Sequence, residues 1–244
     1  MKNYKITVQY DGTRYRGWQR QGNTKNTIQE RFENVLQRMC GHPVEIYASG
    51  RTDGGVHALA QIANFKCHTE MAEKDIMEYL NKYLPEDILV TWVEEADARF
   101  HSRLNAVSKT YEYRLAVKKP DVFIRKYVYT VDAVPDVEKM RRAAQKLLGT
   151  YDFKGFSSVG KTKKSTIRTI NSIEIAENDG IIKIAVNGSG FLYNMVRIIC
   201  GTLYEIGTGE LSEDAIDSVF ESGDRKMAGT TLPACGLVLK EVFY

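Results

Sequence analysis

Alternation of apolar and polar residues marks the start of the chain. Over residues 4–10 every second side chain is apolar, which predicts a strand with one buried face. Residues 28–39 carry apolar side chains at helical spacing, and Thr27 with Glu30 forms the pattern of a capping box before them. The same criteria predict strands at residues 44–48, 59–65 and 88–93 and a helix at residues 73–83. The order β-α-β-β-α-β is that of a ferredoxin-like unit.

The second half of the chain repeats this order. Its first strand is predicted at residues 110–117, and Asn178-Asp179-Gly180 has the composition of a hairpin turn. The other predicted elements are helices at residues 136–148, 191–206 and 210–221 and strands at residues 168–176, 181–187 and 237–243, with Gly149 and Gly207 ending the first two helices. We therefore expect an α+β fold of two ferredoxin-like units, residues 1–105 and 106–244, packed side by side around a central cleft.

The composition, 43% hydrophobic and 27% charged, is typical of soluble globular proteins. No apolar run approaches the roughly 20 residues that span a bilayer. Lys2 and Lys5 interrupt the apolar residues at the N-terminus, so a secretory signal is not predicted. We expect a cytoplasmic protein with no membrane partner.

No cofactor or metal is predicted. The four cysteines form no CxxC pair, and the four histidines show no HxxxH or HxH spacing. The chain also lacks the GxxxxGK[ST] and GxGxxG patterns of nucleotide-binding loops.

The net charge of +3 is weak evidence by itself, but two segments concentrate basic residues. One covers residues 14–20 and the other residues 161–168. Contact with nucleic acid is one interpretation, and a solvated surface loop is the other.

The segment with the strongest chemical signal, residues 47–58, joins two predicted strands. Three glycines frame Arg51, Thr52 and Asp53 in the sequence GRTDGGVHA. A simple hairpin with an Asp-Gly turn accounts for this spacing equally well.

GRTDGGVHA resembles the GRTDAGVHA motif of the tRNA pseudouridine synthase A family, with Gly54 in place of the usual alanine. Further segments match that family in order along the chain. They are Tyr10-Asp11-Gly12 and residues 17–21, Asn81 and residues 84–88, residues 100–103 and 109–113, residues 148–153, residues 191–197, and residues 236–239. Within residues 148–153, Tyr151 stands where the family frequently has histidine. The resemblance implies the pseudouridine synthase fold and isomerisation of uridine in tRNA without a cofactor.

The resemblance also implies roles for particular residues. Asp53 is expected to be the nucleophile, attacking either the base or the sugar. Arg197, in an otherwise apolar segment, is expected to pair with it, since a buried carboxylate needs a cationic partner. Tyr111 is expected to stack on the uracil and to assist proton transfer, and Leu237 to pack beside the base.

A uridine inside folded RNA has to leave its stack before an enzyme can act on it. Arg51 is expected to occupy the space that the base leaves. The residues expected to contact tRNA are Arg14, Arg16, Arg51, Phe100, His101, Ser102, Arg103, Leu104, Gly160, Lys161, Thr162, Lys163, Lys164 and Arg168. The resemblance further implies a homodimer that modifies positions 38, 39 and 40 in the anticodon stem-loop.

The sequence is also compared with two alternative functions, an RNA-recognition module and a glycosidase. A non-catalytic RNA-recognition module shares the β-α-β-β-α-β order, but the predicted strand at residues 59–65 lacks its aromatic signature. A glycosidase normally needs a second carboxylate close to the first, and none accompanies Asp53 in its loop.

Overall fold

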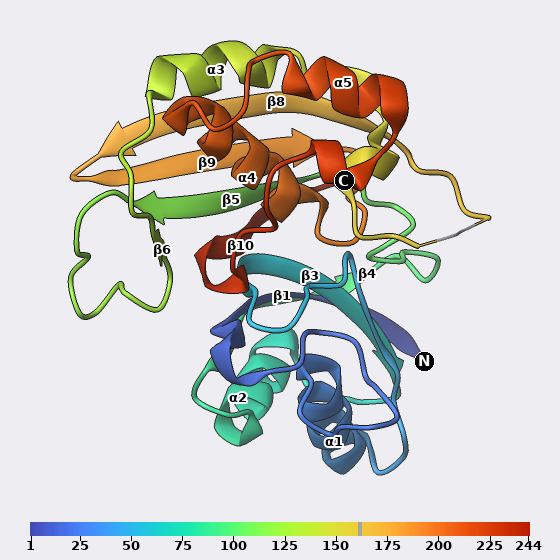
Figure 1. Ribbon diagram of the computed structural model, residues 1–244. Coiled ribbons are helices and arrows are strands. Elements are labelled where there is room, and N and C mark those ends of the chain that lie inside the picture. Colours follow the sequence, from blue (N-terminus) through green and yellow to red (C-terminus); the bar gives the residue numbers. More distant parts are fainter. Residues whose placement is uncertain (161–162) are drawn as a thin grey trace. The chain divides into compact units, whose positions relative to one another are not determined.

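The computed structural model describes residues 1–160 and 163–244 (Figure 1). The chain divides into two compact units: unit 1 comprises Met1–Val107 with Val238–Tyr244, and unit 2 comprises Ser108–Leu237. Both combine helices with a sheet, so the predicted α+β class is confirmed. In the described part of the chain, no helix is long and apolar enough to cross a membrane.

Unit 1 contains the predicted order of strands and helices. Its elements are β1 (Lys2–Tyr10), the 3-10 turn η1 (Gly12–Arg14), α1 (Ile28–Cys40), β2 (Ile46–Ala48), β3 (His57–Cys67), α2 (Glu73–Tyr83), β4 (Ile88–Ala96) and β10 (Leu237–Phe243). One edge of β3 pairs with β1, which in turn pairs with β4, all antiparallel. The other edge of β3 pairs with β2 antiparallel and with β10 in parallel. Both helices cover one face of this sheet (Figure 1).

The cap and the apolar stripe predicted for helix α1 are both present in the structure. Thr27 caps its first turn by accepting from Glu30 N, as predicted, whereas the Glu30 carboxylate pairs with Arg20 at 3.0 Å. Ile28 and Phe32 are fully buried from the same face of the helix. The helix therefore presents its apolar stripe to the sheet and leaves its polar face to solvent.

Unit 2 is a mostly antiparallel sheet with helices. Its elements are β5 (Ser108–Ala116), β6 (Tyr129–Thr130), α3 (Val137–Gln145), β7 (Gly149–Asp152), η2 (Phe153–Phe156), β8 (Ile167–Asn178), β9 (Ile181–Gly188), α4 (Met195–Thr208), α5 (Ala215–Ser222), η3 (Arg225–Met227) and η4 (Ala234–Gly236). The strands run in the order β5-β9-β8-β7, and β6 pairs in parallel with the end of β5. The Asn178-Asp179-Gly180 hairpin joins β8 to β9 as predicted.

Several predicted boundaries in the second half were wrong. Helix α3 ends at Gln145, and Gly149 is not its cap but the first residue of β7, where φ is +114°. Strands β6 and β7 were not predicted because segments of two and four residues carry almost no periodic signal. The additional helix is also shorter than predicted and covers only Ala215–Ser222.

Helix α4 begins later than predicted, at Met195, because Asn194 adopts a left-handed conformation with φ +61°. It continues to Thr208, where Gly209 at φ +84° ends it. Gly207 is therefore internal to the helix and not its cap. A Cβ there would lie 2.7 Å from Pro135 and 2.8 Å from Met140, so glycine permits close packing at that point.

Candidate active site

Asp53 lies in a tight turn between β2 and β3 of unit 1. Its carbonyl accepts a hydrogen bond from Val56 N at 3.1 Å, and Gly55 inside the turn has φ +81°. Asp53 itself is half-buried. The turn thus holds a carboxylate at the start of a strand whose own first residues are buried.

A second segment, residues 10–18, holds this turn by its backbone. Trp18 N donates to Thr52 O at 3.0 Å, and Gly55 N donates to Tyr15 O at 3.2 Å. The Tyr10 hydroxyl and Thr52 Oγ1 lie 2.8 Å apart and both are buried. Asp53 is therefore bracketed by hydrogen bonds on the residues before and after it.

Close approach of these two segments requires glycine at two positions. A Cβ on Gly17 would lie 2.5 Å from Thr52 O, and a Cβ on Gly12 would lie 1.9 Å from Val56 O. No ordinary side chain fits at such distances. This packing explains why the motif near residue 12 accompanies the motif around Asp53.

The loop is also anchored where it leaves β2. Ser49 Oγ donates to Gln61 Oε1 at 2.7 Å, and Gln61 Nε2 donates to Gly50 O at 2.8 Å. Gln61 is fully buried on β3. Gln61 is not among the site residues predicted from the sequence, although a polar residue at an inward position of an apolar strand is a signal for such a role.

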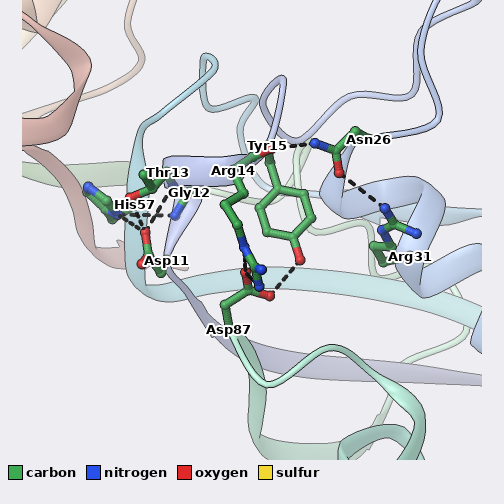
Figure 2. A network of polar contacts seen from close by, with 9 residues as sticks. All are labelled: Asp11, Gly12, Thr13, Arg14, Tyr15, Asn26, Arg31, His57 and Asp87. Carbon is green, nitrogen blue, oxygen red and sulfur yellow. Dashed lines mark hydrogen bonds and ion pairs between the residues drawn. The ribbon is translucent and has the colours of Figure 1, made fainter. Parts of the chain in front are cut away.

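His57 closes the other end of the loop (Figure 2). Its Nδ1 lies 3.1 Å from Gly12 N and 3.2 Å from Asp11 Oδ1. One nitrogen cannot accept from the amide and donate to the carboxylate at once. We assign Nδ1 as the acceptor from Gly12, because a backbone amide can only donate.

Arg14, expected to contact tRNA, joins a polar cluster around Asp87 (Figure 2). Its Nη2 donates to Asp87 Oδ2 at 2.6 Å, and the Tyr15 hydroxyl donates to Asp87 Oδ1 at 2.6 Å. Burial, followed by the hydrogen bond to Asp87, raises the pKa of Tyr15. Asn26 donates to Arg14 O and accepts from Arg31, which ties the cluster to α1. Arg14 is therefore positioned by the fold, although most of its side chain is exposed.

Residues 100–104 separate into an anchor and an exposed tip. Ser102 is fully buried, and its amide donates to Asn64 Oδ1 at 2.9 Å. The Phe100 carbonyl accepts from Asn3 at 2.9 Å. Arg103 and Leu104 are exposed, the latter by 78%. Of this segment, the exposed tip is the part that is open to a ligand, while Ser102 holds it in place.

Arg16 and Arg51, on the segments that frame Asp53, are both exposed. Their side chains are accessible on the surface of unit 1, which suits contact with an anionic ligand.

Tyr111 is in unit 2, near the start of β5. It pairs with Val186 of β9, is buried, and lies edge-on to Phe191 with ring centroids 5.2 Å apart. Leu237, the first residue of β10, is buried as well. Gly236 before it leaves room for the Tyr113 ring, which a Cβ would approach to 2.7 Å.

Arg197 projects from the first turn of α4. Its Nε donates to Leu232 O at 2.6 Å, and its Nη1 donates to Asn194 Oδ1 at 2.7 Å. The side chain is half-buried. Two contacts therefore fix the direction of a guanidinium group on a helix that is otherwise almost entirely apolar.

The second basic segment is described in part. Gly160, Lys163 and Lys164 are exposed, and Arg168 is half-buried with its guanidinium donating to Ser165 O at 3.0 Å. Partial burial lowers the pKa of Arg168. The other two predicted tRNA contacts, Lys161 and Thr162, lie outside the described residues.

The predicted catalytic set is shared between the units. Asp53 and Arg51 belong to unit 1, whereas Tyr111, Arg197 and Leu237 belong to unit 2. Among the residues that the structure describes, no group of three or more His, Cys, Asp and Glu side chains is arranged to hold a metal ion.

Comparison with known proteins identifies the family. The family described as tRNA pseudouridine synthase matches residues 6–105 and 143–244. The chain is 47% identical to "tRNA pseudouridine synthase A" of Bacillus sp. (strain KSM-64), over 100% of both chains. It is 45% identical to "tRNA pseudouridine synthase A 2" of Bacillus cereus (strain ZK / E33L), over 99% of both, and 43% identical to "tRNA pseudouridine synthase A" of Acetivibrio thermocellus, over 100% of both. The resemblance drawn from GRTDGGVHA is confirmed: the chain belongs to the tRNA pseudouridine synthase family.

Proposed function

We propose that this protein is an isomerase that converts uridine to pseudouridine in tRNA. Membership of the family, over residues 6–105 and 143–244, is the observation that carries the proposal. The backbone clamp around Asp53 supports it, because a nucleophile must be held in a defined geometry to react efficiently.

The reaction is balanced without an external reagent. The C1′–N1 bond of uridine breaks, the uracil turns, and a C1′–C5 bond forms. The C5 proton is lost and N1 carries a proton in the product, so nothing is oxidised or reduced. Asp53 would attack either the base or the sugar, forming a covalent intermediate that divides one difficult step into easier ones.

Three side chains of unit 2 would assist Asp53. Arg197 would pair with the carboxylate and keep it ionised, and the hydrogen bonds to Leu232 and Asn194 already orient its guanidinium. Tyr111 would stack on the uracil and help to move the C5 proton. Leu237 would pack beside the base.

The proposed tRNA substrate explains the basic segments. The target uridine would flip out of its stack, and Arg51 would occupy the vacated space. Exposed Arg14, Arg16 and Arg103 would contact phosphates, together with Lys163 and Lys164. Because such contacts read shape and not base sequence, one active site can serve the neighbouring positions 38, 39 and 40 of the anticodon stem-loop.

We further propose that the enzyme acts as a homodimer in the cytoplasm, where one tRNA touches both subunits. A second subunit enlarges the surface available to a substrate that extends well beyond the reacting nucleotide.

Release of tritium from C5-labelled uridine in tRNA tests the proposal. Isomerisation replaces the C5–H bond with a C–C bond, so tritium should appear in water while the base stays attached to the RNA. A glycosidase would instead release labelled uracil, and a binding protein would release neither. Either of those results would refute the proposed activity.

A further inference from the structure

The loop between β5 and β6 carries a feature that the proposed function does not use. We call residues 118–126 the basic loop; it extends beyond the end of β5 (Figure 1). Its exposed cationic residues are Lys118, Lys119, Arg125 and Lys126. At its tip, Phe123 is 85% exposed and Val122 is 63% exposed.

Hydrogen bonds hold the tip of the basic loop in a defined turn. The Asp121 carboxylate accepts from Phe123 N at 2.8 Å, and its carbonyl accepts from Arg125 N at 3.0 Å. Tyr127 N donates to Ile124 O at 2.8 Å. Phe123 is thus presented to solvent by a structured turn, which lowers the entropy lost when a ligand packs against its ring.

The base of the basic loop is also supported. The aliphatic part of Lys118 lies over Gly180 of the β8–β9 hairpin, where a Cβ would approach its side-chain carbons to 2.6 Å. Such a stem lies on the hairpin while its ammonium group stays in water.

The exposed side chains of the basic loop indicate which class of ligand it binds. The tip gathers three exposed apolar side chains, Val122, Phe123 and Ile124, whose contact with water is costly. The same loop carries four exposed cations, and its single carboxylate, Asp121, accepts a hydrogen bond within the turn. An exposed aromatic ring on a positively charged loop matches an unstacked nucleobase flanked by phosphates.

We propose that the basic loop binds tRNA, with one base stacked on Phe123 and neighbouring phosphates contacting Lys119 and Arg125. This inference rests on the proposed tRNA substrate. It adds a contact that lies away from the reacting base: from Tyr111 to Ala116, the last residue of β5, the strand advances about 17 Å, at roughly 3.3 Å per residue. The loop would therefore strengthen binding of tRNA without taking part in the chemistry.

A second copy of this chain is the less favoured occupant. In a two-fold symmetric interface the loop would pack against a surface of the partner, residue i against residue j, and its four cations would enter that interface. The centres of protein interfaces are depleted of charged residues, lysine in particular. Charge complementarity therefore favours RNA.

Binding of full-length tRNA to three variants tests the inference. Phe123→Ala should raise the Kd about 5- to 150-fold, the range expected for loss of one base–aromatic stack. Phe123→Trp should bind like the parent protein. Phe123→Leu, which stays apolar but loses the aromatic ring, should bind like Phe123→Ala. The ring is almost fully exposed, so none of these substitutions disturbs the core.

Two controls sharpen the test. Trp92 of unit 1 is 59% exposed, but the neighbouring Glu94 bonds its indole, so Trp92→Ala should leave the Kd unchanged. Lys119→Gln with Arg125→Gln should reduce the slope of log Kd against log salt by about two, one for each lost phosphate contact.

Three results would overturn the inference. The first is an unchanged Kd in Phe123→Ala, and the second is parent-like binding by Phe123→Leu. The third is a lower oligomeric mass in Phe123→Ala, which would assign the loop to a second copy. Failure of the proposed function looks different, because the parent protein would then neither bind nor modify tRNA.

Discussion

At the scale of single residues, the surroundings of Asp53 are built by backbone contacts that glycines permit. Gly17 and Gly12 lie against the carbonyls of Thr52 and Val56, at distances that exclude any Cβ. Gly54, next to Asp53, differs from them. A Cβ there would meet Arg16 Cα at 3.5 Å and Tyr15 O at 3.5 Å, which is ordinary contact.

Gly54→Ala is therefore predicted to stabilise the protein and to preserve activity. Alanine restricts the unfolded chain and fits the folded one, so the free energy of unfolding should rise by about 0.4–1 kcal/mol. Gly55→Ala is the matched control: φ there is +81°, and the substitution should destabilise the protein. Urea denaturation measures both. Equal effects of the two substitutions would show that the loop conformation described here is wrong.

Arg197→Met is predicted to reduce kcat severely. The substitution would remove the cation proposed to pair with Asp53. Loss of one partner of a buried ion pair costs about 3 to 5 kcal/mol, and because Arg197 is only half-buried we take the lower end, a loss of roughly 100-fold in rate. Arg225→Met is the control. Like Arg197, Arg225 donates a hydrogen bond to a backbone carbonyl, that of Ala228, but it has no proposed catalytic role. If both variants retained normal kcat, the proposed pairing with Asp53 would be dismissed.

At the scale of elements, local patterns predicted some helices and strands well and others poorly. Helix α1 was placed to within one residue because a cap and an apolar stripe agree on its limits. Helix α3 was predicted too long, because Gly149 resembles a C-terminal cap but serves the start of β7. The bounds predicted for β10 agree with the structure, whereas its pairing with β3 depends on residues about 180 positions away and leaves no local signal.

The contacts around Asp53 likewise depend on residues distant in sequence and leave no local signal. The motif identified Asp53, but the Tyr10–Thr52 and Gln61–Gly50 hydrogen bonds that support its loop join separate elements. Nothing in the local sequence around Asp53 specifies these partners. They arise from the register of β1 and β3, which is set by burial on both strands.

The bond from β1 to the loop gives a prediction about alkaline pH. Burial raises the pKa of Tyr10 to about 12, from an ordinary value near 10. The folded state therefore favours neutral Tyr10. The contribution of neutral Tyr10 to the free energy of unfolding is fully present below pH 10 and is lost as the pH rises toward 12. By pH 11.5 the loss should reach about 2 kcal/mol.

Tyr10→Phe removes this dependence. It should be about 1 kcal/mol less stable than the parent at pH 8, because the hydrogen bond to Thr52 is lost, but more stable at pH 11.5. Urea denaturation at the two pH values reports the difference. A stability difference of the same sign and size at both values would mean that Tyr10 ionises normally in the folded state.

At the scale of the whole molecule, the chain leaves unit 1 after Val107 and returns to it at Val238, so unit 1 is completed only by the last seven residues. The proposed catalytic residues are likewise distributed: Asp53 comes from unit 1, and Tyr111 and Arg197 come from unit 2. The proposed function therefore assigns roles to residues of both units.

Assembly is the next prediction at this scale. Light scattering should give a mass of twice the 27.7 kDa of one chain, with one tRNA bound per pair of chains. The expected reason is that a tRNA exceeds the binding surface of one subunit. A mass of one chain, both alone and with tRNA, would contradict the homodimer.

The central claim is that Asp53 is the nucleophile of a tRNA pseudouridine synthase. The most direct test is tritium release from C5-labelled uridine in tRNA by purified Asp53→Asn, with Asp179→Asn, in the surface hairpin after β8, as the control. We predict no detectable release by Asp53→Asn, with tRNA binding and folding retained, and normal release by Asp179→Asn. Appreciable turnover by well-folded Asp53→Asn would show that Asp53 is not the nucleophile.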